Sequence, residues 1–183
     1  MVGKKYVLAI DQSTQGTKGI LFDAEGQLIC RRDVAHEQIV NEKGWVSHDL
    51  DEIYRNTLQV VQDVVTEAGI AKEEIACLGI SNQRETAMVW DKETGKPVYN
   101  AVVWQCARGE KICERIAAAG CADLIRERTG LPLSPYFSAA KIAWVLENVE
   151  GAKEDILQVG QLYQTTNSRG LKWACVTGVA IAE

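Results

Sequence analysis

The order of strand and helix patterns over residues 6–80 is the feature that most constrains the fold. Short aliphatic and β-branched runs cover residues 6–10, 19–22 and 27–32, and polar or Gly-containing turns separate them, which predicts consecutive antiparallel strands. Residues 49–68 then place apolar side chains at spacings of three and four, as an amphipathic helix does, and residues 75–80 read as a buried strand. This order predicts an α/β fold with a mixed sheet flanked by helices.

The rest of the chain continues the alternation. Asp49 followed by Glu52 has the spacing of a capping box, so we expect the long helix to start there. A further strand is expected over residues 86–90, a turn over 91–97, and helices over about 106–119, 121–128 and 138–149. Antiparallel strands, a crossover helix and another strand make up the ribonuclease-H-like core of actin-like ATPases, although a fold of this kind hosts many functions.

Composition excludes several classes of protein. The 183 residues are 46% hydrophobic and 25% charged, which is typical of one soluble globular domain. A net charge of −5 without a basic run argues against nucleic acid as a partner, and no apolar run approaches the ~20 residues of a membrane helix. The 6 cysteines form no C-x-x-C pair, and His36 and His48 lie outside zinc-type spacing, so we predict no metal cluster and a cytoplasmic protein with reduced thiols.

A polar segment at the end of the first strand is the first candidate site. Asp11 ends the apolar run, and small or hydroxylated residues follow it up to Lys18, with Gly16 permitting close backbone approach to an anion. Such a segment suits a phosphate with Mg²⁺, and Asp11 would be the metal-linked carboxylate. Taken alone, the same residues also fit a polar hairpin turn.

Two further motifs decide between these interpretations. Residues 79–86 read Gly-Ile-Ser-Asn-Gln-Arg-Glu-Thr and continue through a Trp-containing stretch to Gln105, and residues 129–138 read Thr-Gly-Leu-Pro-Leu-Ser-Pro-Tyr-Phe-Ser. Together with the first segment they resemble the glycerol kinases of the FGGY carbohydrate kinase family, over residues 6 to about 155. The resemblance implies phosphoryl transfer from ATP, with Mg²⁺, to glycerol.

The resemblance also implies roles for individual residues. Phosphate-loop positions are matched by Asp11, Thr14, Gln15, Gly16 and Lys18. Glycerol-binding positions are matched by Arg84, Glu85, Trp104 and Tyr136. A guanidinium that donates, a carboxylate that accepts and an indole that covers C–H surface suit a small triol.

Spacing alone would give these residues ordinary roles. Arg84 and Glu85 would form a surface ion pair, and Trp104 and Tyr136 would be core aromatics. We interpret Trp90 and Trp144 as core residues, and His36 and His48 as structural or surface residues.

The chain also departs from the family pattern. Lys18 stands where an Arg is usual, which keeps a cation but loses the bidentate fork of a guanidinium. Ala107 stands where a second Arg is common. We expect a kinase domain over residues 1–155, incomplete by comparison with the family, and an atypical tail over 156–183. The family's aspartate base would lie beyond the matching region, so the chain alone is expected to be inactive.

Other functions remain open at this point. The nearest is another polyol or sugar kinase of the same family, such as a xylulokinase, and the second is a non-catalytic actin-like nucleotide-binding module. A ribonuclease-H-type nuclease needs several carboxylates around two metals, and Asp11 is the one clearly placed at a strand end. The sequence leaves a homo-oligomer open and gives no oligomeric order.

Overall fold

The computed structural model describes residues 3, 5–91, 94–152, 157–161, 164–167 and 170–173. The chain forms two compact units, one made of residues 1–38 and 49–83, and the other of residues 39–48 and 84–183. Within the described ranges, no helix is long and apolar enough to span a bilayer. Of the expected tail over 156–183, the residues outside these ranges are not described.

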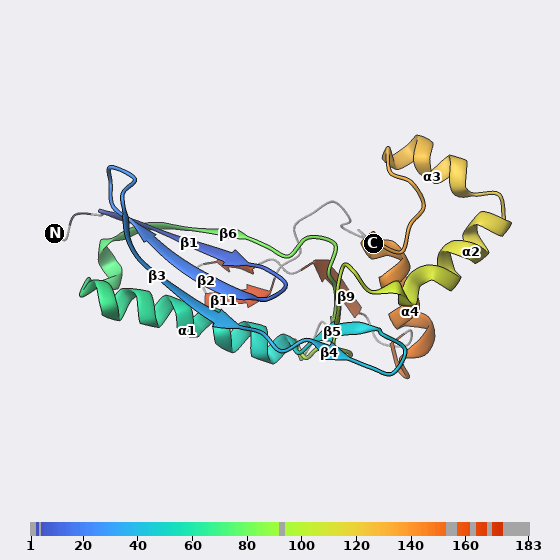
Figure 1. Ribbon diagram of the computed structural model, residues 1–183, viewed down its shortest axis with the longest axis horizontal. Helices are drawn as coiled ribbons and strands as arrows, with labels where there is room; N and C mark the ends of the chain where they lie inside the picture. The colour runs from blue at the N-terminus through green and yellow to red at the C-terminus, as the bar shows by residue number, and fades with distance from the viewer. Residues whose placement is uncertain are drawn as a thin grey trace. The chain divides into compact units, whose positions relative to one another are not determined.

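The first unit is built on a four-stranded sheet in the order β3-β2-β1-β6 (Figure 1). Strands β1 (Tyr6–Gln12), β2 (Gly16–Phe22) and β3 (Leu28–Ala35) are antiparallel, and β6 (Ile75–Ser81) runs parallel to β1. The predicted succession of three antiparallel strands and a later strand over residues 75–80 is therefore confirmed. The polar loop is shorter than the sequence suggested, because Gln12 pairs with Thr17 and leaves residues 13–15 as the turn.

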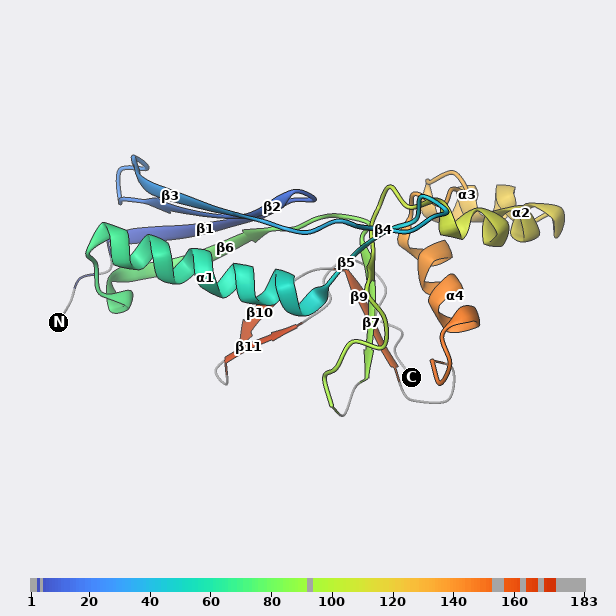
Figure 2. The same cartoon turned by 60° about the horizontal axis from the view of Figure 1, so that its bottom comes forward.

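Helix α1 (Leu50–Ala68) lies along one face of this sheet (Figure 2). Asp49 caps it, because its Oδ1 accepts hydrogen bonds from the amides of Asp51 (2.8 Å) and Glu52 (3.3 Å). The predicted capping box is half formed, since the Glu52 carboxylate accepts instead from the amide of Glu37 at 3.1 Å. The short 3-10 turn η1 (Lys72–Glu74) then leads into β6.

The helix and the sheet approach each other closely in the core of the first unit. The core side chains are Leu8, Ile10, Leu21, Val60 and Val64. A Cβ on Gly19 would stand 3.0 Å from the carbonyl oxygen of Val60, so glycine is what allows the contact between α1 and β2. Buried Gln12 donates to the Thr57 hydroxyl at 3.1 Å, which anchors the end of β1 to the helix. The strand that carries Asp11 is thus firmly supported.

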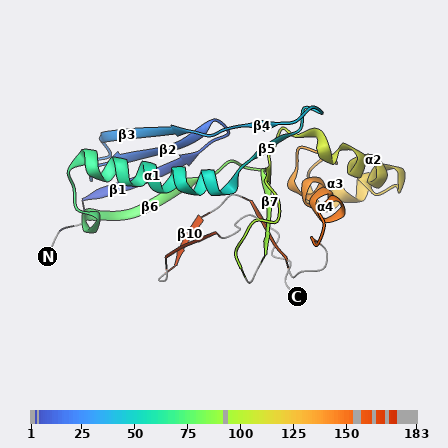
Figure 3. The same cartoon turned by 90° about the horizontal axis from the view of Figure 1, so that it is seen from below.

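Among its described residues, the second unit contains a sheet in the order β4-β5-β8-β7-β9 and three α-helices. Figure 3 labels these helices, α2, α3 and α4. The strands are β4 (Ile39–Val40), β5 (Val46–His48), β7 (Ala87–Asp91), β8 (Ala101–Val102) and β9 (Leu157–Gln161). The helical elements are η2 (Ala107–Gly109), α2 (Glu110–Ala118), α3 (Ala122–Thr129) and α4 (Ser138–Asn148). A separate two-stranded sheet joins β10 (Gln164–Asn167) to β11 (Gly170–Trp173). All three predicted helices are present, and the first starts later than expected because residues 107–109 form a 3-10 turn.

The core of the second unit surrounds a buried arginine. The apolar members are Val46, Val89, Val102, Val103, Cys106 and Val145. Arg108 is buried, and its Nη2 donates to the Ser47 hydroxyl at 2.6 Å. Its guanidinium carbon also lies 4.9–5.6 Å from the ring centroids of Trp45, Tyr99 and Trp144. Trp90 is buried as predicted, and Trp144 is a partly buried member of the same core.

Both histidines are buried and have structural surroundings. His36 Nε2 lies 2.9 Å from the Thr17 hydroxyl, and its Nδ1 lies 3.0 Å from the Asn56 amide nitrogen. His48 is fully buried in β5. The interpretation of His36 and His48 as structural residues is consistent with these positions.

Candidate functional site

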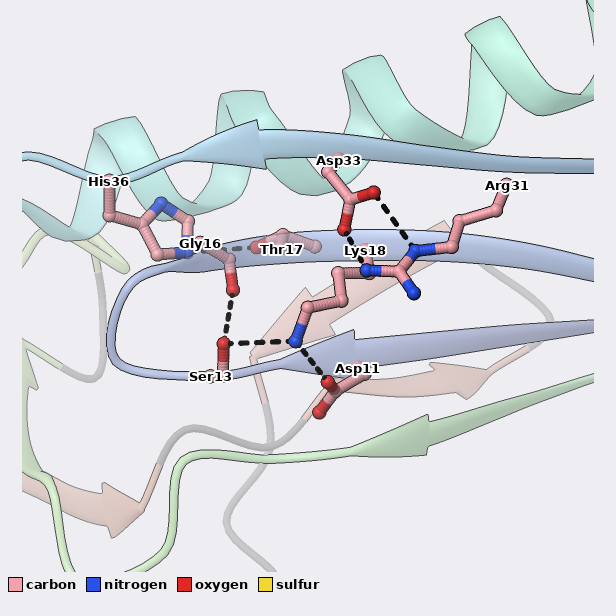
Figure 4. Close-up of polar contacts among 8 residues, drawn as sticks. All are labelled: Asp11, Ser13, Gly16, Thr17, Lys18, Arg31, Asp33 and His36. Atoms are coloured by element: carbon pink, nitrogen blue, oxygen red, sulfur yellow. Dashed lines mark hydrogen bonds and ion pairs between the residues drawn. The ribbon is translucent and has the colours of Figure 1, made fainter.

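The first candidate cluster lies at the turn between β1 and β2 (Figure 4). We use "Asp11 cluster" for Asp11, Ser13 and Lys18. Lys18 Nζ donates to Asp11 Oδ2 at 2.7 Å and lies 3.4 Å from the Ser13 hydroxyl. The two charged residues face each other because they are paired in the β1–β2 register. A carboxylate, a hydroxyl and an ammonium group therefore meet at one point on the sheet surface.

Charged residues continue this row across the sheet. Lys18 is paired in register with Asp33 on β3, and Asp33 is held by a two-pronged hydrogen bond from Arg31, with both N···O distances 2.9 Å. The Arg31 hydrogen bond lowers the pKa of the Asp33 carboxyl group. Sequence reasoning missed Asp33. The available signal was its position two residues after Arg31, which places both side chains on one face of a strand.

The remaining phosphate-loop residues take different positions. Thr14 and Gln15 lie in the turn, and the Gln15 carbonyl accepts from the His36 amide at 3.0 Å. Gly16 begins β2, where its carbonyl accepts from the amide (2.9 Å) and hydroxyl (3.0 Å) of Ser13. A Cβ on Gly16 would stand 2.5 Å from the carbonyl oxygen of Val34. The glycine is thus required by the neighbouring strand, which is a different reason from the anion approach that the sequence suggested.

The second candidate cluster is in the other unit and joins segments far apart in the sequence. We use "Glu85 cluster" for Glu85, Trp104 and Tyr136. The Tyr136 hydroxyl lies 3.5 Å from Glu85 Oε2, and the Trp104 and Tyr136 rings meet edge to face with centroids 5.8 Å apart. Three of the four predicted glycerol-binding residues therefore come together, although 51 positions separate Glu85 from Tyr136.

Backbone contacts hold this cluster in place. The Trp104 amide donates to the Thr86 hydroxyl at 3.1 Å, and the Ser138 hydroxyl donates to the Glu85 carbonyl at 3.3 Å. Glu85 itself has φ of 60°, the left-handed region that residues with a side chain rarely adopt. Arg84, which precedes Glu85 in the sequence, is exposed to solvent.

A buried lysine supports the segment that carries Tyr136. Lys141 on α4 is fully buried, and its Nζ donates to the carbonyls of Pro135 (2.8 Å), Tyr136 and Phe137 (3.3 Å). Burial lowers the pKa of Lys141 to about 8, against the opposing influence of Cys106, Glu85 and Cys113. Sequence reasoning missed Lys141, although a lysine inside a helix whose neighbours are apolar was a usable signal.

Solved structures of sugar kinases share this fold. The glycerol kinase of Plasmodium falciparum, solved with ADP, matches 87% of this chain and 33% of that one, with a TM-score of 0.80 at 35% identity. Gluconate kinase from Lactobacillus acidophilus matches 82% of this chain and 30% of its own, with a TM-score of 0.75 at 21% identity. Xylulose kinase from the same organism matches 82% of this chain and 29% of its own, with a TM-score of 0.72 at 23% identity. The fold is the ribonuclease-H-like, actin-like α/β fold of the sugar kinases, as the sequence predicted.

Sequence comparison gives the family. The model of the N-terminal domain of the FGGY family of carbohydrate kinases matches residues 6–173, and this chain belongs to that family. Glycerol kinase 1 of Thermotoga maritima is 51% identical over 173 residues, which are 94% of this chain and 35% of that protein. Glycerol kinase of Clavibacter michiganensis is 45% identical over 177 residues, 97% of this chain and 35% of that protein.

The extent of these matches bears on the domain limits. The chain spans 35% of the length of each of these two curated relatives. The family match runs on past residue 155 to residue 173. A boundary near residue 155 stays a prediction.

Proposed function

We propose that this chain forms the glycerol-binding and phosphate-binding part of an ATP-dependent glycerol kinase. The observation that carries the proposal is the Glu85 cluster, in which a carboxylate, a phenol and an indole meet within one unit. Curated relatives that are 51% and 45% identical to this chain, both named glycerol kinase, support it. We further propose a cytoplasmic location.

The chemistry of the Glu85 cluster suits a small polyol. The Glu85 carboxylate accepts hydrogen bonds from hydroxyl groups, the Tyr136 hydroxyl both donates and accepts, and the Arg84 guanidinium donates. The indole of Trp104 offers an apolar surface to the C–H side of the carbon chain. A cluster that pairs every hydroxyl of its ligand discriminates against analogues that lack one, because a buried polar group is then left unpaired.

The Asp11 cluster fits Mg²⁺ and a phosphate by its donor set. Mg²⁺ prefers carboxylate oxygens together with phosphate oxygens and water, and Asp11 supplies a half-exposed carboxylate. The Lys18 ammonium donates to anionic oxygen, which it already does toward Asp11. Bound Mg²⁺ would spread the negative charge of the phosphate groups. The role of this chain there is to hold and orient, through Asp11, Thr14, Gln15, Gly16 and Lys18.

The first test measures binding in the 183-residue chain. We expect isothermal titration to show glycerol binding that Arg84→Ala weakens, because the change removes a donor beside the Glu85 carboxylate. Arg126→Ala is the matched control, since Arg126 is an exposed arginine on α3. Equal glycerol affinity in the wild-type and Arg84→Ala chains would reject the assignment of Arg84.

The second test measures phosphoryl transfer. Because the relatives are longer, the matching segment of Thermotoga maritima glycerol kinase 1 is replaced by this chain's residues 6–173, and ADP release is followed with glycerol, erythritol and xylulose. We expect turnover with glycerol and much less with the other two. Preference for xylulose would instead favour a xylulokinase, and nucleotide binding without turnover would favour a non-catalytic module.

A further inference from the structure

Lys141 is an unusual residue to find fully buried. An ammonium group loses strong hydration when it is removed from water, so buried lysines are rare unless their three N–H donors are satisfied. Here the three donors meet three consecutive carbonyl oxygens, those of Pro135, Tyr136 and Phe137. The match between donors and acceptors explains how the ammonium is tolerated inside the unit.

The three carbonyls belong to the segment that enters helix α4. Residues 135–137 precede the helix, and Phe137 is its N-cap residue, so α4 supplies no backbone partners to the carbonyl oxygens of Pro135 and Tyr136. Lys141 reaches back from the first turn of α4 and supplies them. The backbone conformation of this segment therefore depends on one side chain that follows it in sequence.

This segment carries one member of the Glu85 cluster. The Tyr136 hydroxyl lies 3.5 Å from Glu85 Oε2, the outer limit of a hydrogen bond, so a small backbone shift would break that contact. The Tyr136 ring meets the Trp104 ring edge to face with centroids 5.8 Å apart. We propose that Lys141 is a positioning residue for the glycerol site, whose ammonium group fixes residues 135–137 and thereby holds Tyr136 against Trp104 and Glu85. The identity of the ligand, glycerol, rests on the proposed function, whereas the contacts of Lys141 and Tyr136 do not.

The charge state of Lys141 provides a readout that simple core packing would not. The titratable groups that act on it are Glu85, Cys106 and Cys113, and the Tyr136 ring centroid lies 6.0 Å from Nζ. Its pKa is lowered to about 8, chiefly by burial. Above that pH the amine keeps two N–H donors for three carbonyls. One carbonyl then loses its partner, and the segment is less firmly held.

Titration of Lys141 should change glycerol affinity and folding stability in opposite directions as pH rises. The pKa of Lys141 is lower in the folded chain than the 10.5 of an unperturbed lysine. Between about 8 and 10.5 the unfolded chain binds more protons, so the contribution of Lys141 to stability rises with pH in this window and is lost as pH falls through about 8. Weaker glycerol binding above pH 8 therefore cannot come from Lys141-linked unfolding.

The test uses the 183-residue chain, its Lys141→Met variant and a Lys96→Met control, since Lys96 is exposed in the turn after β7. Glycerol affinity is measured by titration calorimetry from about pH 6 to about pH 9.5, a range that brackets the titration. Hydrogen exchange of the backbone amides of residues 134 and 136–138 is measured by mass spectrometry at neutral pH, since Pro135 has no N–H. The Phe137 amide is a useful probe, because it donates to the Ser134 carbonyl at 3.3 Å.

We expect wild-type affinity to fall above about pH 8, and Lys141→Met to bind glycerol on the order of tenfold more weakly with a flat pH profile and faster exchange at 134–138. Lys96→Met should match the wild type throughout. Unchanged affinity, profile and exchange in Lys141→Met would overturn the inference. If that variant fails to fold, the wild-type pH profile decides, and a profile flat through pH 8 overturns it.

Failure of the proposed function looks different. If the wild-type chain binds no glycerol at any pH, the ligand assignment is wrong, and the positioning role is judged on exchange alone. Faster exchange at 134–138 in Lys141→Met would then still support it, whereas equal exchange would overturn it.

Discussion

The left-handed backbone of Glu85 makes a stability prediction that is independent of any ligand. Its φ of 60° costs a residue with a Cβ roughly 1–2 kcal/mol relative to glycine. Glycine in turn costs about 0.4–1 kcal/mol relative to alanine, because it adds freedom to the unfolded chain. At the middle of each range the strain is the larger quantity, so Glu85→Gly should be more stable than Glu85→Ala by roughly 0.8 kcal/mol. Both variants lose the carboxylate, and the comparison therefore isolates the backbone.

Thermal and urea unfolding of the two variants measure this difference. For a chain of this size the expected rise in Tm of Glu85→Gly over Glu85→Ala is about 1–4 °C. Both variants should bind glycerol far more weakly than the wild type, because the Tyr136 hydroxyl loses its partner. Equal stability, or Glu85→Ala the more stable of the two, would refute the argument that this residue is strained. Normal glycerol affinity in both would separate the strain from the binding site.

Three further substitutions test other parts of the chain. When this chain's residues 6–173 replace the matching segment of Thermotoga maritima glycerol kinase 1, Asp11→Asn should lower kcat far more than it raises KM for glycerol. Calorimetry that shows lost glycerol binding with intact Mg-nucleotide binding would contradict this. Trp104→Ala should weaken glycerol binding through loss of the apolar surface, and an unaltered calorimetric profile would make the indole a bystander. Gly19→Ala should destabilise the first unit by about 1–3 kcal/mol in urea unfolding, because its Cβ would meet the Val60 carbonyl at 3.0 Å; a neutral effect would show that α1 can move away.

The elements of the fold were largely readable from the sequence, because periodicity reports which face of an element is buried. Short aliphatic and β-branched runs predicted β1–β3, and the three-and-four spacing predicted α1 to within a residue of its observed start. Their ends were harder to predict, since the pairing of Gln12 with Thr17 depends on a partner strand rather than on either residue's own preference. Local pattern fixes an element's type, and its length is settled by long-range contacts.

The sequence predicted which residues belong to the candidate site but not their backbone conformation or their contacts. The motifs located Glu85 and Tyr136, yet no local signal shows that a glutamate adopts positive φ or that a lysine five residues after Tyr136 turns back to its carbonyl. Gly16 illustrates the same limit, because its glycine is explained by the Val34 carbonyl on another strand. Each of these features depends on contacts between segments that are distant in sequence or folded back on themselves.

The two clusters differ in how far they depart from local rules, and this difference predicts how each responds to substitution. The Glu85 cluster contains a strained backbone, and the ammonium supporting it is fully buried, both of which lower stability unless the surrounding structure compensates. The Asp11 cluster contains an ordinary strand pair whose side chains are 30% and 39% exposed, and such ion pairs contribute roughly 0–1 kcal/mol. Substitutions of Glu85 or Lys141 should therefore change both the free energy of unfolding and the affinity for glycerol. Changes at Asp11 or Lys18 should alter nucleotide-dependent steps while the free energy of unfolding stays nearly constant, so the two clusters are separable by measuring stability beside affinity.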